Sequence, residues 1–159
     1  MGLYATFTLD QRVFGQTIPM IREIIRSCAI TPVPHAPPHV RGLINLRGQV
    51  VTILDLAVRL GMPRRATDER SHILILKTDA ELASMQARGE GRGLQGSADV
   101  VGFLVDTLGD VVEADESKIE PPSANVTEAE GRFLSGVIQT DSGLLVLLNI
   151  RTVLADDQE

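Results

Sequence analysis

The chain has few aromatic residues, a single cysteine and no tryptophan. Only 3% of its 159 residues are aromatic, so we expect an aliphatic core and no stacking platform for single-stranded nucleic acid. Cys28 is the one cysteine, which excludes an internal disulfide and is typical of a protein in a reducing compartment. The formal net charge of −6 would repel a phosphate backbone, so nucleic acid is not an expected partner.

The chain also lacks long apolar segments. No apolar run approaches the roughly 20 residues that a membrane-spanning helix requires. The first four residues contain neither the basic region nor the hydrophobic stretch of a secretory signal. We therefore expect a cytoplasmic protein that does not insert into a membrane. A hydrophobic content of 43% and a charged content of 23% are typical of a globular protein, and this length allows two small barrels that share a core.

Residues 42–56 predict a β-hairpin. Two largely apolar runs, Leu43–Leu46 and Val50–Leu54, flank the dipeptide Arg47-Gly48. Glycine in the second central position permits the positive φ that a two-residue turn needs. Apolar side chains on both faces of the second run predict a strand that is buried on both sides. The tight turn should expose Arg47, which is then either an ordinary polar turn residue or a contact residue on a rigid support.

Most other segments predict short strands. The expected strands are residues 4–9, 12–18, 23–28, 71–78, 100–105, 110–113, 133–139 and 144–149. Short helical segments are expected at residues 19–22, 56–60 and 151–154. Residues 31–38 contain four prolines and predict an extended connector. Residues 80–99 contain four glycines and predict a flexible loop.

The chain also repeats itself, with a period of about 90 residues that is too long for a solenoid unit. The matched segments are Gly15–Ile25 with Gly102–Val112, and Gly42–Leu56 with Gly136–Ile150. Both matches occur in the same order, which favours an internal duplication with repeat one at residues 3–62 and repeat two at 71–155. We expect one mainly β domain over residues 1–159, composed of two similar small barrels with a short helix after each hairpin.

Motifs for catalysis, cofactors and metals are weak in this sequence. Residues 91–96 fit the dinucleotide-binding pattern G-x-G-x-x-G, but no strand directly precedes them and no amphipathic helix follows. His35 and His39 have the spacing of two ligands on a helix, yet the two prolines between them are incompatible with that helix. No serine or cysteine lies in a recognisable nucleophile motif. We expect no enzyme activity, cofactor or metal, and a nucleotide-dependent enzyme that uses residues 91–96 is the rival hypothesis.

Glu23 is the acidic residue of greatest interest. It lies on a largely apolar segment between Ile21 and Ile24, with Arg22 and Arg26 nearby. Two interpretations stay open from the pattern alone. Glu23 is either an exposed strand residue or an acid that faces a partner at the rim of an apolar groove.

The hairpin segment resembles the signature of the CheW family of chemotaxis coupling proteins. Residues 40–56, Val-Arg-Gly-Leu-Ile-Asn-Leu-Arg-Gly-Gln-Val-Val-Thr-Ile-Leu-Asp-Leu, carry the most specific part, and the resemblance runs from about Tyr4 to Leu154. Supporting segments are Ile21–Ile24, Val100–Asp106, Leu108–Val111, Ile119–Pro122, Gly136 and Leu147–Asn149. The resemblance implies two five-stranded SH3-like barrels and a non-enzymatic adaptor. Such adaptors join a CheA-type histidine kinase, through its similar regulatory domain, to the cytoplasmic tips of methyl-accepting chemoreceptors.

The resemblance also implies partner-binding residues. Glu23 and Arg47 match the family's acid and arginine, and Arg41 matches its basic residue before the hairpin. The apolar positions that the family places along the groove between its barrels are here Ile21, Val40 and Val100.

Two departures from the family pattern bear on the partners. Thr52 stands where the family has proline, which should be harmless in a strand. Residues 80–99 replace a tight turn of the family, which leaves the identity of the partners open. The alternative is therefore a coupling protein of a chemosensory pathway other than chemotaxis. Other CheW-like domains are further candidate partners.

Overall fold

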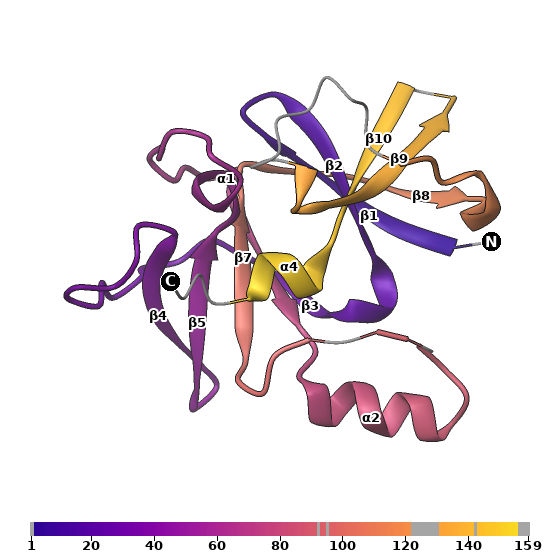
Figure 1. Cartoon of the computed structure of the whole chain (residues 1–159). Coiled ribbons are helices and arrows are strands. Elements are labelled where there is room, and N and C mark those ends of the chain that lie inside the picture. The colour runs from indigo at the N-terminus through magenta and orange to yellow at the C-terminus, as the bar shows by residue number, and fades with distance from the viewer. Residues whose placement is uncertain (1, 92, 95, 122–130, 142, 156–159) are drawn as a thin grey trace.

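Ten strands form two five-stranded sheets in the part of the chain that the structure, a computed structural model, describes: residues 2–91, 93–94, 96–121, 131–141 and 143–155 (Figure 1). Sheet A has the order β8-β1-β2-β10-β9 and consists of β1 (Gly2–Leu9), β2 (Arg12–Thr17), β8 (Thr107–Ala114), β9 (Leu134–Thr140) and β10 (Gly143–Leu148). Sheet B has the order β3-β6-β7-β5-β4 and consists of β3 (Ile21–Arg26), β4 (Val40–Leu46), β5 (Gln49–Asp55), β6 (His72–Leu76) and β7 (Val101–Val105). The prediction of a mainly β fold is therefore confirmed.

Short helices connect the strands. The α-helices are α1 (Leu56–Arg59), α2 (Asp79–Ala87) and α4 (Ile150–Leu154), and the 3₁₀ segments are η1 (Ile18–Met20) and η2 (Glu116–Lys118). No helix of the described residues is long and apolar enough to cross a membrane. Arg92 and Gln95 of the segment 91–96, and Pro122 of the segment 119–122, lie outside the described residues.

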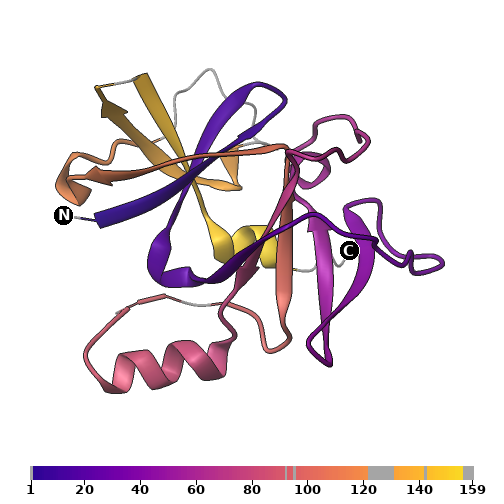
Figure 2. The same cartoon turned by 180° about the vertical axis from the view of Figure 1, so that it is seen from behind.

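The two sheets have the same strand order when β1 to β5 are exchanged with β6 to β10, each strand with the one five places away. Each sheet nevertheless combines both repeats. Sheet A takes β1 and β2 from repeat one and β8 to β10 from repeat two, whereas sheet B takes β6 and β7 from repeat two and the rest from repeat one (Figures 1 and 2). The first two strands of each repeat are thus exchanged.

Equivalent residues of the two halves have equivalent contacts. A Cβ atom added at Gly42 would lie 2.1 Å from the carbonyl oxygen of Thr31, and one added at Gly136 would lie 2.6 Å from that of Glu120. Only glycine permits so close an approach of backbone at both places. Each hairpin is then followed by a side-chain N-cap, from Asp55 before α1 and from its counterpart before α4.

The largest apolar cluster joins the two sheets. All four phenylalanines of the chain belong to it, two from sheet A, one from β7 and one from the segment before β9: Phe7, Phe14, Phe103 and Phe133. Burying a side chain of this size contributes roughly 1.5–3 kcal/mol. Leu56 of α1 and Ile150 of α4 pack in the same cluster, so the two short helices help to fix how the sheets meet.

The prediction of a flexible loop over residues 80–99 is wrong in its first part, where α2 forms. The threonine hydroxyl of Thr78 accepts a hydrogen bond from the backbone N–H of Glu81 at 3.3 Å, and the Glu81 carboxylate accepts one from the Thr78 N–H at 3.1 Å. This reciprocal capping box starts the helix. Leu82 and Met85 then anchor it in the main cluster. The glycines that suggested a loop all follow the helix.

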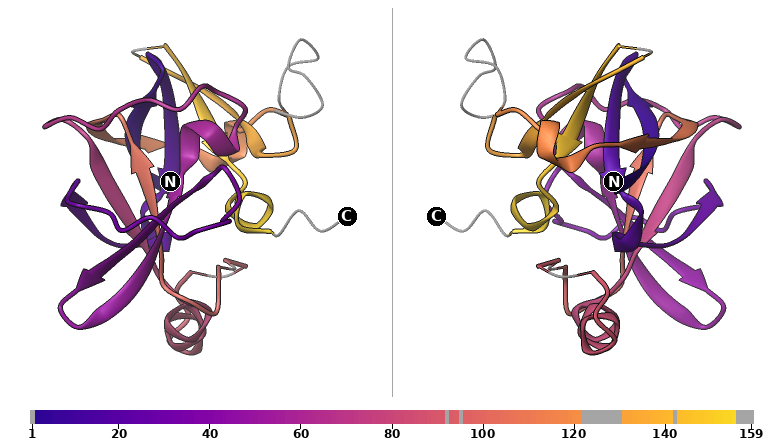
Figure 3. Two further views of the ribbon diagram at one scale, coloured as in Figure 1. Left: turned by 90° about the vertical axis from the view of Figure 1, so that its left-hand side faces the viewer. Right: turned by 90° about the vertical axis from the view of Figure 1, so that its right-hand side faces the viewer.

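The prediction that β5 is buried on both faces is correct only for the half that is distant from the turn. Val51, Ile53 and Leu54 are buried, but Val50 is 62% exposed. The tip of the β4–β5 hairpin therefore projects beyond the core of sheet B. This tip lies at the same end of the molecule as α2 (Figure 3).

Candidate partner-binding site

Arg47 lies at the tip of the β4–β5 hairpin. Arg47 and Gly48 have φ values of 52° and 86°, so both central residues of the turn are left-handed, as in the two-residue turns that match the twist of a hairpin. The side-chain oxygen of Asn45 accepts a hydrogen bond from the Gly48 N–H at 2.8 Å. The Arg47 side chain is 68% exposed. The turn thus supports an arginine in solvent.

Arg47 forms an ion pair with Glu23 of β3 through one guanidinium nitrogen and one carboxylate oxygen. The strands β3 and β4 are opposite edges of sheet B, so the sheet curls until its edges meet at this pair. An exposed ion pair contributes only about 0–1 kcal/mol to stability. Its main effect is to orient two charged side chains that the sequence places far apart.

Arg22, the neighbour of Glu23, makes a second link to the hairpin. Its Nη1 donates to the side-chain oxygen of Gln49 at 3.0 Å, and its Nε donates to both carboxylate oxygens of Glu81 at 3.1 Å. The hydrogen bond to Arg22 is the main cause of a lowered pKa for Glu81, and the same bond raises the pKa of Arg22. Gln49 and Glu81 are not among the predicted site residues, although the spacing Thr78-x-x-Glu81 is a signal for a capping box.

Arg41 is directed inward, away from the Glu23–Arg47 pair. Its guanidinium donates to the carbonyl oxygen of Arg65 at 2.8 Å and lies 3.5 Å from a carboxylate oxygen of Asp55. The side chain is only 10% exposed, and this burial lowers the pKa of Arg41. Arg41 therefore holds the segment between α1 and β6 and has little surface left for a partner.

The three apolar candidates do not form one surface. Ile21 and Val40 are half-buried against the cluster between the sheets. Val100 is 7% exposed and packs in a separate cluster of sheet B. The exposed apolar residue next to Glu23 is Ile24, which the sequence analysis did not select. The structure thus brings together Glu23 and Arg47, with Ile21 and Ile24 on the same strand.

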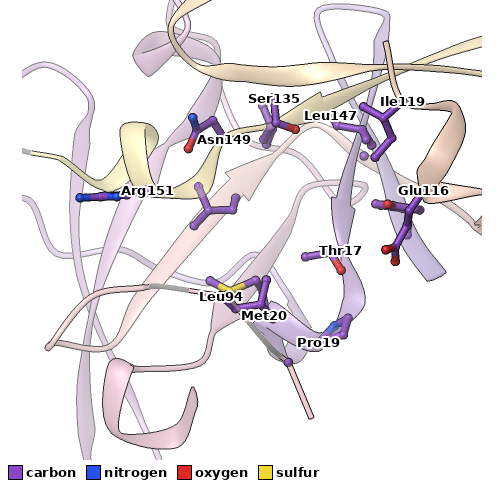
Figure 4. A pocket seen from close by; sticks show the side chains of 16 residues that line it. Thr17, Pro19, Met20, Leu94, Glu116, Ile119, Ser135, Leu147, Asn149 and Arg151 are labelled. Atoms are coloured by element: carbon purple, nitrogen blue, oxygen red, sulfur yellow. The ribbon is translucent and has the colours of Figure 1, made fainter. Parts of the chain in front are cut away.

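A cavity of about 750 Å³ is lined by none of the predicted partner-binding residues. It lies between sheet A, α4 and the residues after α2, and its labelled lining includes Thr17, Met20, Leu94 and Glu116 (Figure 4). Gly91 also lines it, but its segment follows a helix and precedes a strand. This order differs from the strand–loop–helix order that dinucleotide binding requires.

Metal ligands are not gathered in the part of the chain that the structure describes, where no three His, Cys, Asp or Glu side chains form a group that could hold an ion. The fold and the ion pair instead define a small two-sheet β protein in which a hairpin-tip arginine is paired with an acid of the opposite sheet edge. A family model described as the CheW-like domain matches residues 3–158. Because this match covers nearly the whole sequence, the chain belongs to the CheW family.

Individual proteins agree with this assignment. The chain is 30% identical over 152 residues to "Chemotaxis protein CheW" of Rhizobium meliloti (strain 1021), with 96% of this chain and 86% of the relative covered. It is 27% identical over 151 residues to the Thermotoga maritima protein of the same name, with 95% and 86% covered. The crystal structure of the scaffolding protein TtCheW from Thermoanaerobacter tengcongensis matches with a TM-score of 0.79 at 25% identity, over 99% of this chain and 90% of that one. The resemblance inferred from the hairpin is confirmed.

Proposed function

We propose that this protein is a non-enzymatic adaptor that couples the cytoplasmic tips of chemoreceptors to a CheA-type histidine kinase. The observation that carries the proposal is the Glu23–Arg47 pair, which a member of the CheW family holds in solvent at the tip of a cross-linked hairpin. The chemistry of such a site is recognition of another protein surface.

Glu23 and Arg47 can replace their contact with each other by contacts with a partner protein. Separating Glu23 from Arg47 costs little because solvent reaches both side chains, which are 27% and 68% exposed, and screens the pair. A guanidinium offers a planar fork of donors, and a carboxylate or a row of carbonyls on a partner can accept from it in two places. Once a partner excludes water, the same contact becomes stronger and more selective. We propose that the regulatory domain of the kinase provides this partner.

The hairpin is suited to present Arg47 with little loss of entropy. Glu23 holds the arginine itself, and Arg22 holds Gln49 directly after the turn. Both bonds come from β3, on the opposite edge of sheet B. Preorganisation of this kind improves affinity because less motion is lost on binding. The apolar residues Ile21 and Ile24 on β3 would add a contact for the receptor.

Co-assembly of three purified components tests the proposal. The protein is mixed with a CheA-type kinase and receptor fragments, and the fraction of kinase that sediments with the receptor is measured. We expect co-sedimentation with the natural chain and none with Arg47→Glu. Arg12→Glu, an exposed charge reversal at the start of β2 in sheet A, is the matched control and should assemble normally. The proposal is wrong if the natural chain never links the two components.

One observation bears on the alternative of a chemosensory pathway other than chemotaxis. α2 stands where the family pattern has a tight turn, and it contacts the strand that carries Glu23 through Arg22. Capture of partners from the native cell, followed by their identification, tests this alternative. A kinase encoded with a motility system supports chemotaxis, and a kinase with another output supports the alternative.

A further inference from the structure

The strand β3 contains an irregularity at Arg22. In its pairing with β6, Ile21 lies opposite Leu76 and Glu23 lies opposite Ile75, so Arg22 is an extra residue without an opposite partner. A bulge of this kind changes the direction of neighbouring side chains. Here it allows two consecutive side chains, Arg22 and Glu23, to reach the same hairpin tip, although successive residues of a regular strand face opposite sides.

We infer that Glu81 of α2 is a positioning residue for Arg47, acting through Arg22, and the inference rests on the proposed partner site. Glu81 accepts three hydrogen bonds from two nitrogens of Arg22, Nε and Nη2, and the third nitrogen, Nη1, donates to Gln49. In this arrangement the guanidinium of Arg22 is bonded to Glu81 and Gln49. The carboxylate of Glu23 is therefore free of Arg22 and accepts from Arg47.

The inference follows from competition between two arginines for one carboxylate. Arg22 and Glu23 are adjacent on β3, and opposite charges within a few Å attract each other even near a protein surface. If Glu81 lost its charge, Glu23 would be the remaining carboxylate that attracts Arg22. Arg47 would then share its partner, and its side chain would sample more orientations before binding.

α2 is constructed to keep Glu81 in place. Glu81 is the third residue of the helix and closes the capping box with Thr78, so its carboxylate is fixed on both sides. Leu82, the next residue, and Met85, one turn further on, bury the same side of the helix in the main cluster. The lowered pKa of Glu81 keeps the side chain charged at neutral pH. The helix thus presents a rigid, charged acceptor to the bulge.

The experiment compares two variants in the full chain. Glu81→Gln retains the capping box, because glutamine serves at this position as well, but removes the charge. Asp79→Asn removes a charge from the same turn of α2; this residue accepts from the backbone of Gly96 rather than from Arg22, so it is the matched control. We expect Glu81→Gln to bind the regulatory domain of the kinase roughly 3- to 30-fold more weakly, in the range for residues of one network, and Asp79→Asn to bind normally.

A double-mutant cycle separates positioning from general support. In an Arg47→Ala background, Glu81→Gln should have no further effect on affinity, whereas a purely structural role would give the same loss in both backgrounds. NMR signals of the arginine Nε–H groups in the free protein give a readout that needs no partner. We expect the Arg47 signal to shift and broaden in Glu81→Gln and to stay unchanged in Asp79→Asn. An unchanged Arg47 signal, or additive losses, overturns the inference. Failure of the natural chain to bind the kinase would contradict the proposed function instead. The NMR result would still test the positioning role of Glu81.

Discussion

The two halves of the molecule share a strand order but differ in charge at equivalent edge positions. In sheet B, Glu23 of β3 and Arg47 of the hairpin tip form an ion pair. The equivalent positions in sheet A, according to the repeat, are Asp110 and Asp141, and both are exposed. Two acids repel each other, so sheet A has no counterpart of the pair. The two sheets are similar scaffolds, and only one of them carries the charges for the proposed contact.

The connections between the first two strands of each repeat differ as well. β1 and β2 are joined by Asp10-Gln11, both with positive φ, in a tight turn. The equivalent connection from β6 to β7 contains α2. This helix thus connects two strands of sheet B, the sheet that carries the ion pair. Its residue Glu81 accepts a hydrogen bond from Arg22, the neighbour of Glu23. Both differences between the halves concentrate polar contacts at one end of sheet B.

Arg47→Glu has the largest expected effect, because it gives the tip of sheet B the acidic character of sheet A. We expect complete loss of kinase–receptor co-assembly, since the variant repels Glu23 and any partner carboxylate. The free energy of unfolding should change by no more than about 0.5 kcal/mol, as for most surface changes. Sedimentation and thermal unfolding are measured on the same preparation. A large fall in melting temperature would show instead that Arg47 braces the fold.

Leu82→Ala tests whether the packing of α2, in the β6–β7 connection, contributes to the stability of the fold. Leu82 is buried in the cluster between the sheets, and removing a buried leucine side chain costs about 2–5 kcal/mol. Urea unfolding measures this loss. Ser84→Ala, on the exposed side of the same helix, is the control and should change little. Equal stability of the two variants would show that α2 is dispensable, as a flexible loop would be.

Ile21→Asp tests the apolar part of β3. Ile21 is half-buried against the main cluster, so we expect a loss of about 1–3 kcal/mol in stability from the buried polar group. We also expect weaker receptor binding in the fraction that stays folded, as measured by titration with a receptor fragment. Leu144→Asp changes an exposed leucine of sheet A and should bind normally. A folded Ile21→Asp variant with unchanged affinity would remove this strand from the receptor site.

The smallest expected effect concerns pH. The pKa of Glu81 is lowered in the folded protein from its ordinary value of 4.5, chiefly by the hydrogen bond to Arg22. The corresponding stability is present above that ordinary value and is lost as the pH falls through the folded pKa. Because the Glu81 side chain is 36% exposed, solvent screening holds the effect to at most about 1 kcal/mol. Urea midpoints between neutral pH and pH 3 should fall less in Glu81→Gln than in the natural chain.

Local features were predictable from the sequence, whereas contacts between distant segments were not. The Arg47-Gly48 turn follows from the positive φ that glycine permits at its second position. The pairing of Arg47 with Glu23 depends on the curl of sheet B, and no local pattern encodes it. The inward direction of Arg41 depends on the carbonyl of Arg65, in a segment with no regular structure. The exchange of strands between repeats was equally hidden, because exchanged and unexchanged sheets have the same alternation of side chains.

That exchange constrains how the chain becomes a folded protein. Sheet A needs β10 beside β2, where Val146 is paired with Phe14 in parallel. The first strands to leave the ribosome therefore cannot complete their sheet until nearly the whole chain has been synthesised. Pairings between such distant segments slow folding. Until they form, the strand edges are unpaired and prone to aggregation. Sheet B needs β7 beside β5 and can close while repeat two is still being synthesised. The half that carries Arg47 can therefore form first and serve as the surface on which the other half is completed.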